Sequence, residues 1–259
     1  MGDIMTGLLE GKVVVVSGGT KGVGRGVCYE AARQGATVVF GGRDDEAASK
    51  IVEQIKSEGH EAMYVHTDLF KIEDIKNLFD KAYEAYGRID GFVNYAGLTY
   101  ASTIVECPED VYDDIFAINV KAPFFAIQNA IKYIQKNDGG SIVLFGSTHD
   151  DKGEKDRAAY ACSKAALSVM STHVAKHYAE DGIRINYVTM GWTPTEGELA
   201  LREKQGITEA ELRAMAKEMV PVGKMQEIED YVPAVMYLLS DYSTMATGSN
   251  IRISGGLYF

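Results

Sequence analysis

A run of β-branched residues that stops at a cluster of glycines constrains this chain most. Residues 12–17 read KVVVVS and lead into Gly18, Gly22 and Gly24. The apolar run predicts a buried strand, and the glycines permit a sharp turn into a helix over 24–34. A helix N-terminus offers free N–H groups and a partial positive charge, so it favours an anionic diphosphate. The pattern predicts a dinucleotide site, although a plain tight turn would look the same.

Apolar runs alternate with helical patterns along the chain. We expect strands over 12–17, 36–40, 61–66, 90–94, 141–145, 183–188 and 250–253, and helices over 24–34, 45–58, 72–86, 120–136 and 158–180, with another opening at Pro108. Uniformly apolar strands between helices indicate a parallel sheet covered on both faces. We therefore predict an α/β Rossmann fold, a doubly wound parallel sheet in three layers, α/β/α.

The length of 259 residues favours a single domain over 1–259. Residues 191–220 break the alternation with Pro194, Gly197, Gly206 and an amphipathic stretch. Because this insertion follows the carboxyl end of a strand, we predict that it is a substrate lid.

Charge and composition exclude several classes of protein. The net charge of -11 opposes binding to nucleic acid. No apolar run approaches the ~20 residues that span a bilayer, and residues 1–10 lack the features of a secretory signal. Cys28, Cys107 and Cys162 lie far apart without metal-ligand spacing, so we predict no metal site. We expect three buried, unpaired thiols and a cytoplasmic protein.

Tyr160 and Lys164 stand four positions apart on the predicted helix over 158–180, so their side chains share one face. A free tyrosine has a pKa of about 10, and an ammonium beside it favours the phenolate. Such a phenol could exchange a proton with an alcohol oxygen. Ser147 and Asn119 accompany the pair, although a strand-end turn and a helix cap would explain them as well.

These motifs together resemble the single-domain form of the short-chain dehydrogenase/reductase family over nearly the whole chain. The glycine turn resembles its Thr-Gly-x-x-x-Gly-x-Gly pattern, with Ser17 in first place. Residues 94–97 (NYAG) resemble Asn-Asn-Ala-Gly, with Tyr95 as a departure, and residues 186–191 (NYVTMG) resemble Asn-x-Val-x-Pro-Gly, with Met190 replacing proline. The resemblance implies hydride transfer between a nicotinamide cofactor and a carbonyl or alcohol substrate.

The resemblance also implies a role for each matching residue. The catalytic set would be Asn119, Ser147, Tyr160 and Lys164. In it Tyr160 exchanges the substrate proton, Ser147 hydrogen-bonds the substrate oxygen, and Asn119 holds a water for proton relay through Lys164. The implied cofactor-binding residues are Gly18, Thr20, Lys21, Gly22, Val23, Gly24, Arg43, Asp68, Asn94, Ala96, Gly97, Tyr160, Lys164, Gly191, Thr193 and Thr195.

The end of the second strand bears on the choice of cofactor. An acid there would accept from the ribose 2′-hydroxyl of NAD, whereas a base would receive the 2′-phosphate of NADP. Arg43 is followed by Asp44 and Asp45, and Lys21 supplies a second cation. We favour NADP(H). NAD(H) stays open because Asp44 could reach the ribose, and Arg43 could be a surface cation paired with either acid.

The loop over 148–157 (THDDKGEKDR) borders the substrate in the family and is strongly charged here. We hypothesise a polar, hydroxyl-rich substrate such as a sugar or polyol, with Ser147, His149, Tyr160 and Trp192 as its contacts. A solvated loop tip is the competing interpretation, and Trp192 could instead cover the cofactor.

Two other functions stay open at this point. A catalytically silent dinucleotide-binding regulator or scaffold would need the glycines but not the four catalytic residues. A sugar-nucleotide epimerase or dehydratase of the extended branch would need a larger C-terminal part. The resemblance further implies a homo-oligomer, most simply a tetramer, with the apolar C-terminal residues from Ile251 to Phe259 at an interface, although a core strand would explain them too.

Overall fold

The computed structural model describes residues 7–258 and contains, within that range, one seven-stranded sheet in the order β3-β2-β1-β4-β5-β6-β7. Residues 1–6 and 259 of the predicted domain lie outside the described part, and so do most of the residues used to argue against a secretory signal. Every neighbouring pair of strands is parallel. The strands are β1 (Val13–Ser17), β2 (Thr37–Gly42), β3 (Ala62–His66), β4 (Gly91–Asn94), β5 (Gly140–Ser147), β6 (Ile183–Met190) and β7 (Asn250–Ile253). The predicted doubly wound parallel sheet is confirmed.

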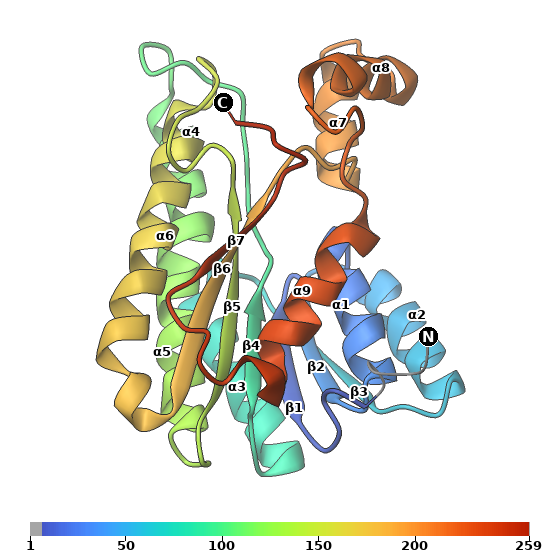
Figure 1. Cartoon of the computed structure of the whole chain (residues 1–259), viewed down its shortest axis with the longest axis vertical. Helices are drawn as coiled ribbons and strands as arrows, with labels where there is room; N and C mark the ends of the chain where they lie inside the picture. The colour runs from blue at the N-terminus through green and yellow to red at the C-terminus, as the bar shows by residue number, and fades with distance from the viewer. Residues whose placement is uncertain (1–6, 259) are drawn as a thin grey trace.

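Helices cover both faces of this sheet (Figure 1). One face carries α1 (Gly22–Arg33), α2 (Asp45–Ser57) and α9 (Ile228–Leu239), and the other carries α3 (Ile72–Tyr86), α5 (Ala122–Ile134) and α6 (Ala158–His177). Helix α4 (Glu109–Phe116) precedes α5 on that second side. In the described chain, no helix combines the length and the apolar character needed to cross a bilayer.

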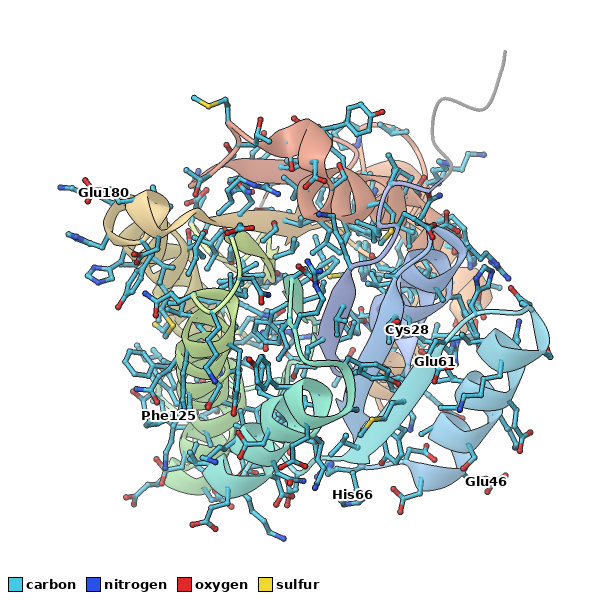
Figure 2. The ribbon with its side chains drawn as sticks, turned by 90° about the horizontal axis from the view of Figure 1, so that it is seen from below. Cys28, Glu46, Glu61, His66, Phe125 and Glu180 are labelled. Atoms are coloured by element: carbon cyan, nitrogen blue, oxygen red, sulfur yellow. The ribbon has the colours of Figure 1, made fainter. Side chains whose placement is uncertain are left out.

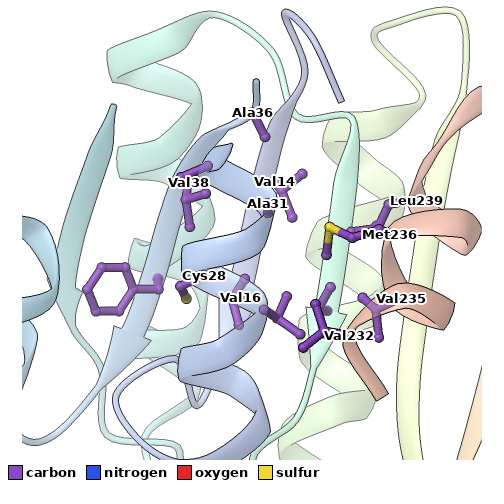
Figure 3. Close-up of a cluster of buried hydrophobic side chains, with 14 of the residues drawn as sticks. Val14, Val16, Cys28, Ala31, Ala36, Val38, Val232, Val235, Met236 and Leu239 are labelled. Atoms are coloured by element: carbon purple, nitrogen blue, oxygen red, sulfur yellow. The ribbon is translucent and has the colours of Figure 1, made fainter. Parts of the chain in front are cut away.

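Strand β1 shows why the sheet is buried on both sides. Side chains alternate between the faces of a strand, so a run of valines sends apolar groups both ways. Val14 and Val16 join one hydrophobic cluster, while Val13 and Val15 join the other. Figure 3 shows the first cluster, in which β1 and β2 pack against α1 and α9.

Two sequence expectations need correction. Helix α9 was not expected, because Pro233 inside it removes a backbone donor and hides the helical pattern. The cysteines were expected to be buried, yet only Cys28 is, whereas Cys107 is half-buried and Cys162 is exposed. Figure 2 shows Cys28 in the interior, with Glu46 and Glu180 at the periphery. All three thiols are free.

A π-helical turn (Ala117–Lys121) joins α4 to α5 and contains Asn119. Sequence patterning predicts two separate helical stretches here, but the chain is helical from 109 to 134. The wider turn replaces a break in the helix, and such turns are frequent at functional sites.

The lid predicted over 191–220 contains α7 (Glu196–Lys204) and α8 (Glu209–Met219), which stand beyond one end of the sheet (Figure 1). These helices have a small hydrophobic cluster of their own, which includes Trp192, Leu212 and Leu257. The segment is therefore attached to the main core through few apolar contacts.

Glycine at position 146 is required by a tyrosine on the next strand. The ring of Tyr187 lies against the Gly146 backbone, and an added Cβ would overlap it. Tyr187 is 2% exposed, and its hydroxyl donates to the Lys164 carbonyl oxygen at 3.2 Å. The ring therefore has no room to move aside.

We expect Gly146→Ala to lower the free energy of unfolding by about 1–3 kcal/mol, because the core there is already filled. Urea titration checks this. Gly197→Ala is the matched control, since the nearest atom to its added Cβ lies at 3.9 Å and alanine is a better helix former than glycine in the first turn of α7. Equal stability of both variants would contradict the overlap.

Candidate active site

The polar residues singled out above gather at the carboxyl ends of the strands. The strand order reverses between β1 and β4, and this is where parallel sheets open a crevice for ligands. The N–H groups of Tyr95 and Ala96 both donate to the Ser17 carbonyl oxygen at 3.1 Å. These bonds hold the end of β4 against the glycine turn.

The glycine turn forms a cradle, a space beside the backbone that any side chain at these positions would fill. Gly18 has a φ of 82°, and a Cβ there would lie 2.8 Å from the Ala96 nitrogen. Gly24 faces the Gly18 carbonyl with no room for a Cβ. The ring of Tyr95, the departure from the family motif, packs over Gly22 and Gly24. Burial raises the pKa of Tyr95 to about 12, so the hydroxyl is neutral.

The N-terminus of α1 is capped by an acid from the predicted lid. Helix α1 has no side-chain cap of its own and no acid in its first turn. Glu196, the first residue of α7, accepts from the Gly22 N–H at 3.0 Å and pairs with Arg25 at 2.9 Å. A carboxylate oxygen is thus held where an anionic diphosphate oxygen would be stable, so the residues present fit a dinucleotide.

One pocket of about 500 Å³ extends from the glycine turn across the ends of β2 and β3. Of the predicted cofactor-binding residues it contains Gly18, Thr20, Lys21, Arg43, Asp68, Ala96 and Gly97. Lys21 pairs with Asp44 at 3.2 Å, and Asp44 also accepts from a backbone N–H of α2. Arg43 is exposed and makes no salt bridge with any described residue. The alternative in which Arg43 pairs with Asp44 or Asp45 is therefore wrong.

A cleft of about 450 Å³ adjoins this pocket and shares Lys21 and Gly97 with it. It contains the predicted residues Lys21, Gly22, Gly97, Ser147, His149, Tyr160, Lys164, Gly191, Trp192, Thr193 and Thr195. Val23, Gly24, Asn94 and Asn119 line neither space and lie buried behind them. The structure thus brings most of the predicted site into one continuous groove.

Tyr160, Ser147 and Lys164 meet in this cleft. Ser147, the last residue of β5, lines the cleft with Tyr160 and lies near enough to the phenol to act on its pKa. The Lys164 ammonium lies 5.7 Å from the centre of the Tyr160 ring and donates to the Phe145 carbonyl oxygen at 3.0 Å. The expected pairing of phenol and ammonium on one helical face is present.

The pKa values in the protein alone differ from the sequence expectation. Burial raises the pKa of Tyr160, although the nearby Ser147 hydroxyl acts in the opposite direction. Burial also lowers the pKa of Lys164 to about 8. The expectation that the ammonium alone makes the phenol acidic is therefore wrong for the unliganded protein, because desolvation opposes both charges.

Asn119 is fixed by its own hydrogen bonds. Its side chain accepts from the Leu98 N–H at 2.7 Å and donates to the Leu98 carbonyl at 2.8 Å and to Ser163 at 3.0 Å. Gly97 lies between this amide and the Lys164 ammonium, since an added Cβ would be 3.6 Å from one and 3.4 Å from the other. The amide at the middle of the π-helical turn therefore lies near the lysine.

Five charged residues of the cleft were not named as site residues from the sequence: Glu154, Arg157, Glu196, Glu198 and Arg202. Arg202 lies over the Trp192 ring at 5.3 Å, and Glu198 accepts from both of these side chains at 2.7 Å. The spacing of Glu198 and Arg202 on one helical turn was the available signal. The charge of the loop over 148–157 likewise pointed to Glu154 and Arg157.

Comparison with known proteins agrees with this geometry. A family model described as enoyl-(acyl carrier protein) reductase matches residues 18–258. An uncharacterised oxidoreductase of Thermotoga maritima is 34% identical over 247 residues, covering 95% of this chain and 97% of that protein. A short-chain type dehydrogenase/reductase from Mycobacterium marinum has a crystal structure that is 25% identical with a TM-score of 0.85, covering 96% of this chain and 95% of that one.

This chain belongs to the short-chain dehydrogenase/reductase family. It is an oxidoreductase that moves hydride between a nicotinamide cofactor and a carbonyl or alcohol group. Its relatives act on different substrates. A 3β-hydroxysteroid dehydrogenase of Mediterraneibacter gnavus is 32% identical over 274 residues, 98% of each protein. A 3-oxoacyl-(acyl-carrier-protein) reductase of Thermotoga maritima is also 32% identical, over 250 residues, 96% of this chain and 98% of that protein.

The buried lysine of this dehydrogenase lowers its stability. Between pH 8 and the ordinary lysine pKa of about 10.5, the unfolded chain binds more protons than the folded protein. The cost of burying the ammonium is therefore fully present below pH 8 and disappears as the pH rises to about 10.5. At 1.36 kcal/mol per pKa unit it is of the order of 3 kcal/mol, offset by about 1 kcal/mol for the bond to Phe145.

We expect Lys164→Met to be more stable than wild type by about 1–2 kcal/mol at pH 7, with a gain that shrinks between pH 8 and 10. Urea unfolding of both proteins across this range measures it, and the exposed Lys50→Met is the control. A gain that stays constant with pH would show that burial of the charge is not its cause.

Proposed function

We propose that Tyr160 exchanges the proton of the substrate oxygen while hydride moves at the carbon that bears it. The observation that carries this is the meeting of Tyr160, Ser147 and Lys164 in one cleft. The Ser147 hydroxyl lies beside the phenol and can hydrogen-bond the same substrate oxygen. Lys164 would also bind the ribose of the cofactor, and Asn119 would hold the water that connects Lys164 to solvent.

The nicotinamide cofactor supplies or accepts the hydride when bound, and its oxidised ring adds a positive charge near Tyr160. That charge and the Lys164 ammonium together oppose the burial that raises the pKa of the phenol. A lysine pKa of about 8 leaves most of the ammonium charged at neutral pH. Proton transfer at Tyr160 therefore requires bound cofactor, so the reaction takes place only in the complex of the protein with its cofactor.

The substrate that fits the cleft is polar and rich in hydroxyl groups, such as a sugar or polyol. His149, Glu154 and Arg157 from the loop after β5 face Glu198 and Arg202 from α7 across the same space. Burial of an apolar steroid against these groups would remove charged side chains from water, at a cost of several kcal/mol. Hydroxyl groups can both donate to the carboxylates and accept from the guanidinium groups.

A panel of sugars, polyols, steroids and aliphatic ketones, assayed with NAD(H) and NADP(H), tests this function. We expect turnover of polyols, and a loss of about 10²–10⁴-fold in Tyr160→Phe with little change in cofactor affinity, because only proton transfer is removed. The exposed Tyr242→Phe is the control. A silent dinucleotide-binding protein would show no turnover in any variant, and turnover of bulky apolar ketones alone would reject the polyol.

NADP(H) is the cofactor that the pocket at the ends of β2 and β3 favours. Arg43 has no salt bridge with any described residue, whereas Asp44 is engaged with Lys21 and with α2. The guanidinium is thus available to a 2′-phosphate, and the Asp44 carboxylate is less available to a 2′-hydroxyl. Asp68 lies in the same pocket, at the side where the adenine would be held.

We expect Arg43→Ala to raise KM for NADP(H) by about tenfold to a hundredfold and to leave KM for NAD(H) nearly unchanged, because a charged hydrogen bond contributes about 1.5–3 kcal/mol. Steady-state kinetics with both cofactors measures this. Lys50→Ala on α2 controls for the loss of a surface cation. Equal losses with the two cofactors would favour NAD(H) and a role for Asp44.

The lid over 191–220 would have to move as the diphosphate arrives, since Glu196 holds the Gly22 N–H. Thr195 caps α7 just before Glu196, and Thr193 is tied to the Tyr231 hydroxyl at 2.6 Å. Release of Glu196 would leave both threonines beside the cofactor, with Gly191 behind them. Trp192, 8% exposed under Arg202, would then face the substrate from the lid side.

A homo-oligomer, most simply a tetramer, is favoured by apolar side chains on the outer helices. Tyr112 on α4, Phe124 on α5 and Val169 on α6 are 46%, 53% and 66% exposed. Such a surface is normally covered by a partner. Light scattering that gives the mass of one chain would reject this assembly. The three free thiols favour the cytoplasm, which cell fractionation tests.

A further inference from the structure

The Ser147 hydroxyl has a functional group on each of two sides. On one side lies the Tyr160 phenol, which lines the same cleft and whose pKa Ser147 lowers. On the other side it accepts from the backbone N–H of His149 at 3.2 Å and lies 3.2 Å from His149 Nδ1. The His149 ring meets the Tyr160 ring edge-on at 5.7 Å. Ser147 therefore lies between the phenol and an imidazole, a group that can both accept and donate a proton.

The far side of the imidazole meets a carboxylate. His149 Nε2 lies 3.9 Å from Glu154 Oε2. The His149 side chain is 12% exposed, whereas that of Glu154 is 35% exposed. The nearby imidazole of His149 lowers the pKa of Glu154, so this group is a carboxylate. A carboxylate at Nε2 favours the proton on that nitrogen and leaves Nδ1 to accept from the Ser147 hydroxyl.

We propose that Ser147, His149 and Glu154 form a proton path that connects Tyr160 with solvent, beside the one through Lys164. This inference rests on the proposed role of Tyr160. During alcohol oxidation the substrate O–H proton passes to the Tyr160 phenolate as hydride leaves the carbon. The phenol then gives its proton to Ser147 Oγ, whose own proton passes to His149 Nδ1. His149 releases the Nε2 proton to Glu154 or to water, and carbonyl reduction runs the same steps in reverse.

Other ionisable groups lie around His149, and they also contribute to the pH dependence of kcat. Asp150 is adjacent in the loop, and burial raises the pKa of its carboxyl group. Arg157 stands at the start of α6, and Tyr160 and Lys164 follow on that helix. Glu198 and Arg202 face His149 from α7. Because these groups stay in place when His149 is replaced, the effect of the imidazole can be separated from theirs.

A simple substrate contact is the competing role for His149. Such a contact would stabilise the bound polyol and would change KM. The relay instead limits how fast Tyr160 recovers its protonation state, so it changes kcat and its dependence on pH. The two roles therefore differ in their kinetic signature, whichever alcohol serves as substrate.

The test uses the full-length enzyme with the best alcohol from the panel. The amide of His149→Gln can still form hydrogen bonds, but it cannot accept a proton and pass it on. We expect His149→Gln and Glu154→Gln to lower kcat by at least about tenfold, to change KM by less than about threefold, and to lose one ionisation step from the kcat–pH profile. The solvent deuterium isotope effect on kcat should rise, and imidazole in the buffer should restore the rate of His149→Ala but not of Tyr160→Phe.

His60→Gln, before β3 at the opposite edge of the sheet, is the matched control and should retain the wild-type profile. Thermal unfolding verifies that each variant is folded. A rise in KM with unchanged kcat and pH profile would overturn the relay in favour of a substrate contact. If Tyr160→Phe kept the wild-type rate, the proposed function itself would fail, which the His149 variants alone would not show.

Discussion

Burial of both faces of the parallel sheet is the constraint on which the rest of this structure depends. Valines of β1 point alternately into two hydrophobic clusters, so neither face has room for a polar ligand. Polar function is left to the edge where the strands end. The reversal of strand order between β1 and β4 opens that edge, and the glycine turn, Ser147 and the end of β4 all meet there.

The active site is less stable than an apolar core in the same place would be. An ammonium is buried beside a phenol, and burial shifts the pKa of each group toward its neutral form. Under the proposed function, bound cofactor supplies the positive charge that offsets this burial. The carboxylate of Glu196 occupies the first turn of α1, where the diphosphate of that cofactor would bind.

Local signals predicted the parts of this site that depend on neighbouring residues in sequence. The strand–glycine–helix pattern, and Tyr160 with Lys164 on one helical turn, needed no knowledge of distant contacts. The expectations that failed concern the environment. Burial reversed the expected pKa shift of Tyr160, left Cys162 exposed, and stabilised α9 around Pro233 by packing it on α1. Each of these outcomes depends on which helices and strands pack against one another, and the periodicity of the sequence does not encode this packing.

The sequence by itself determined the fold class and the glycine cradle, and it named the residues that we propose as the catalytic set, because backbone conformation and helical spacing are local properties. Only the tertiary structure decided what surrounds these residues. It brought Glu196 from the lid to the first turn of α1, and it aligned Glu154, His149 and Ser147 behind Tyr160. It also separated Arg43 from its acidic neighbours. Such contacts arise from the way the chain closes in space, since distances between remote side chains are set by packing and not by order along the chain.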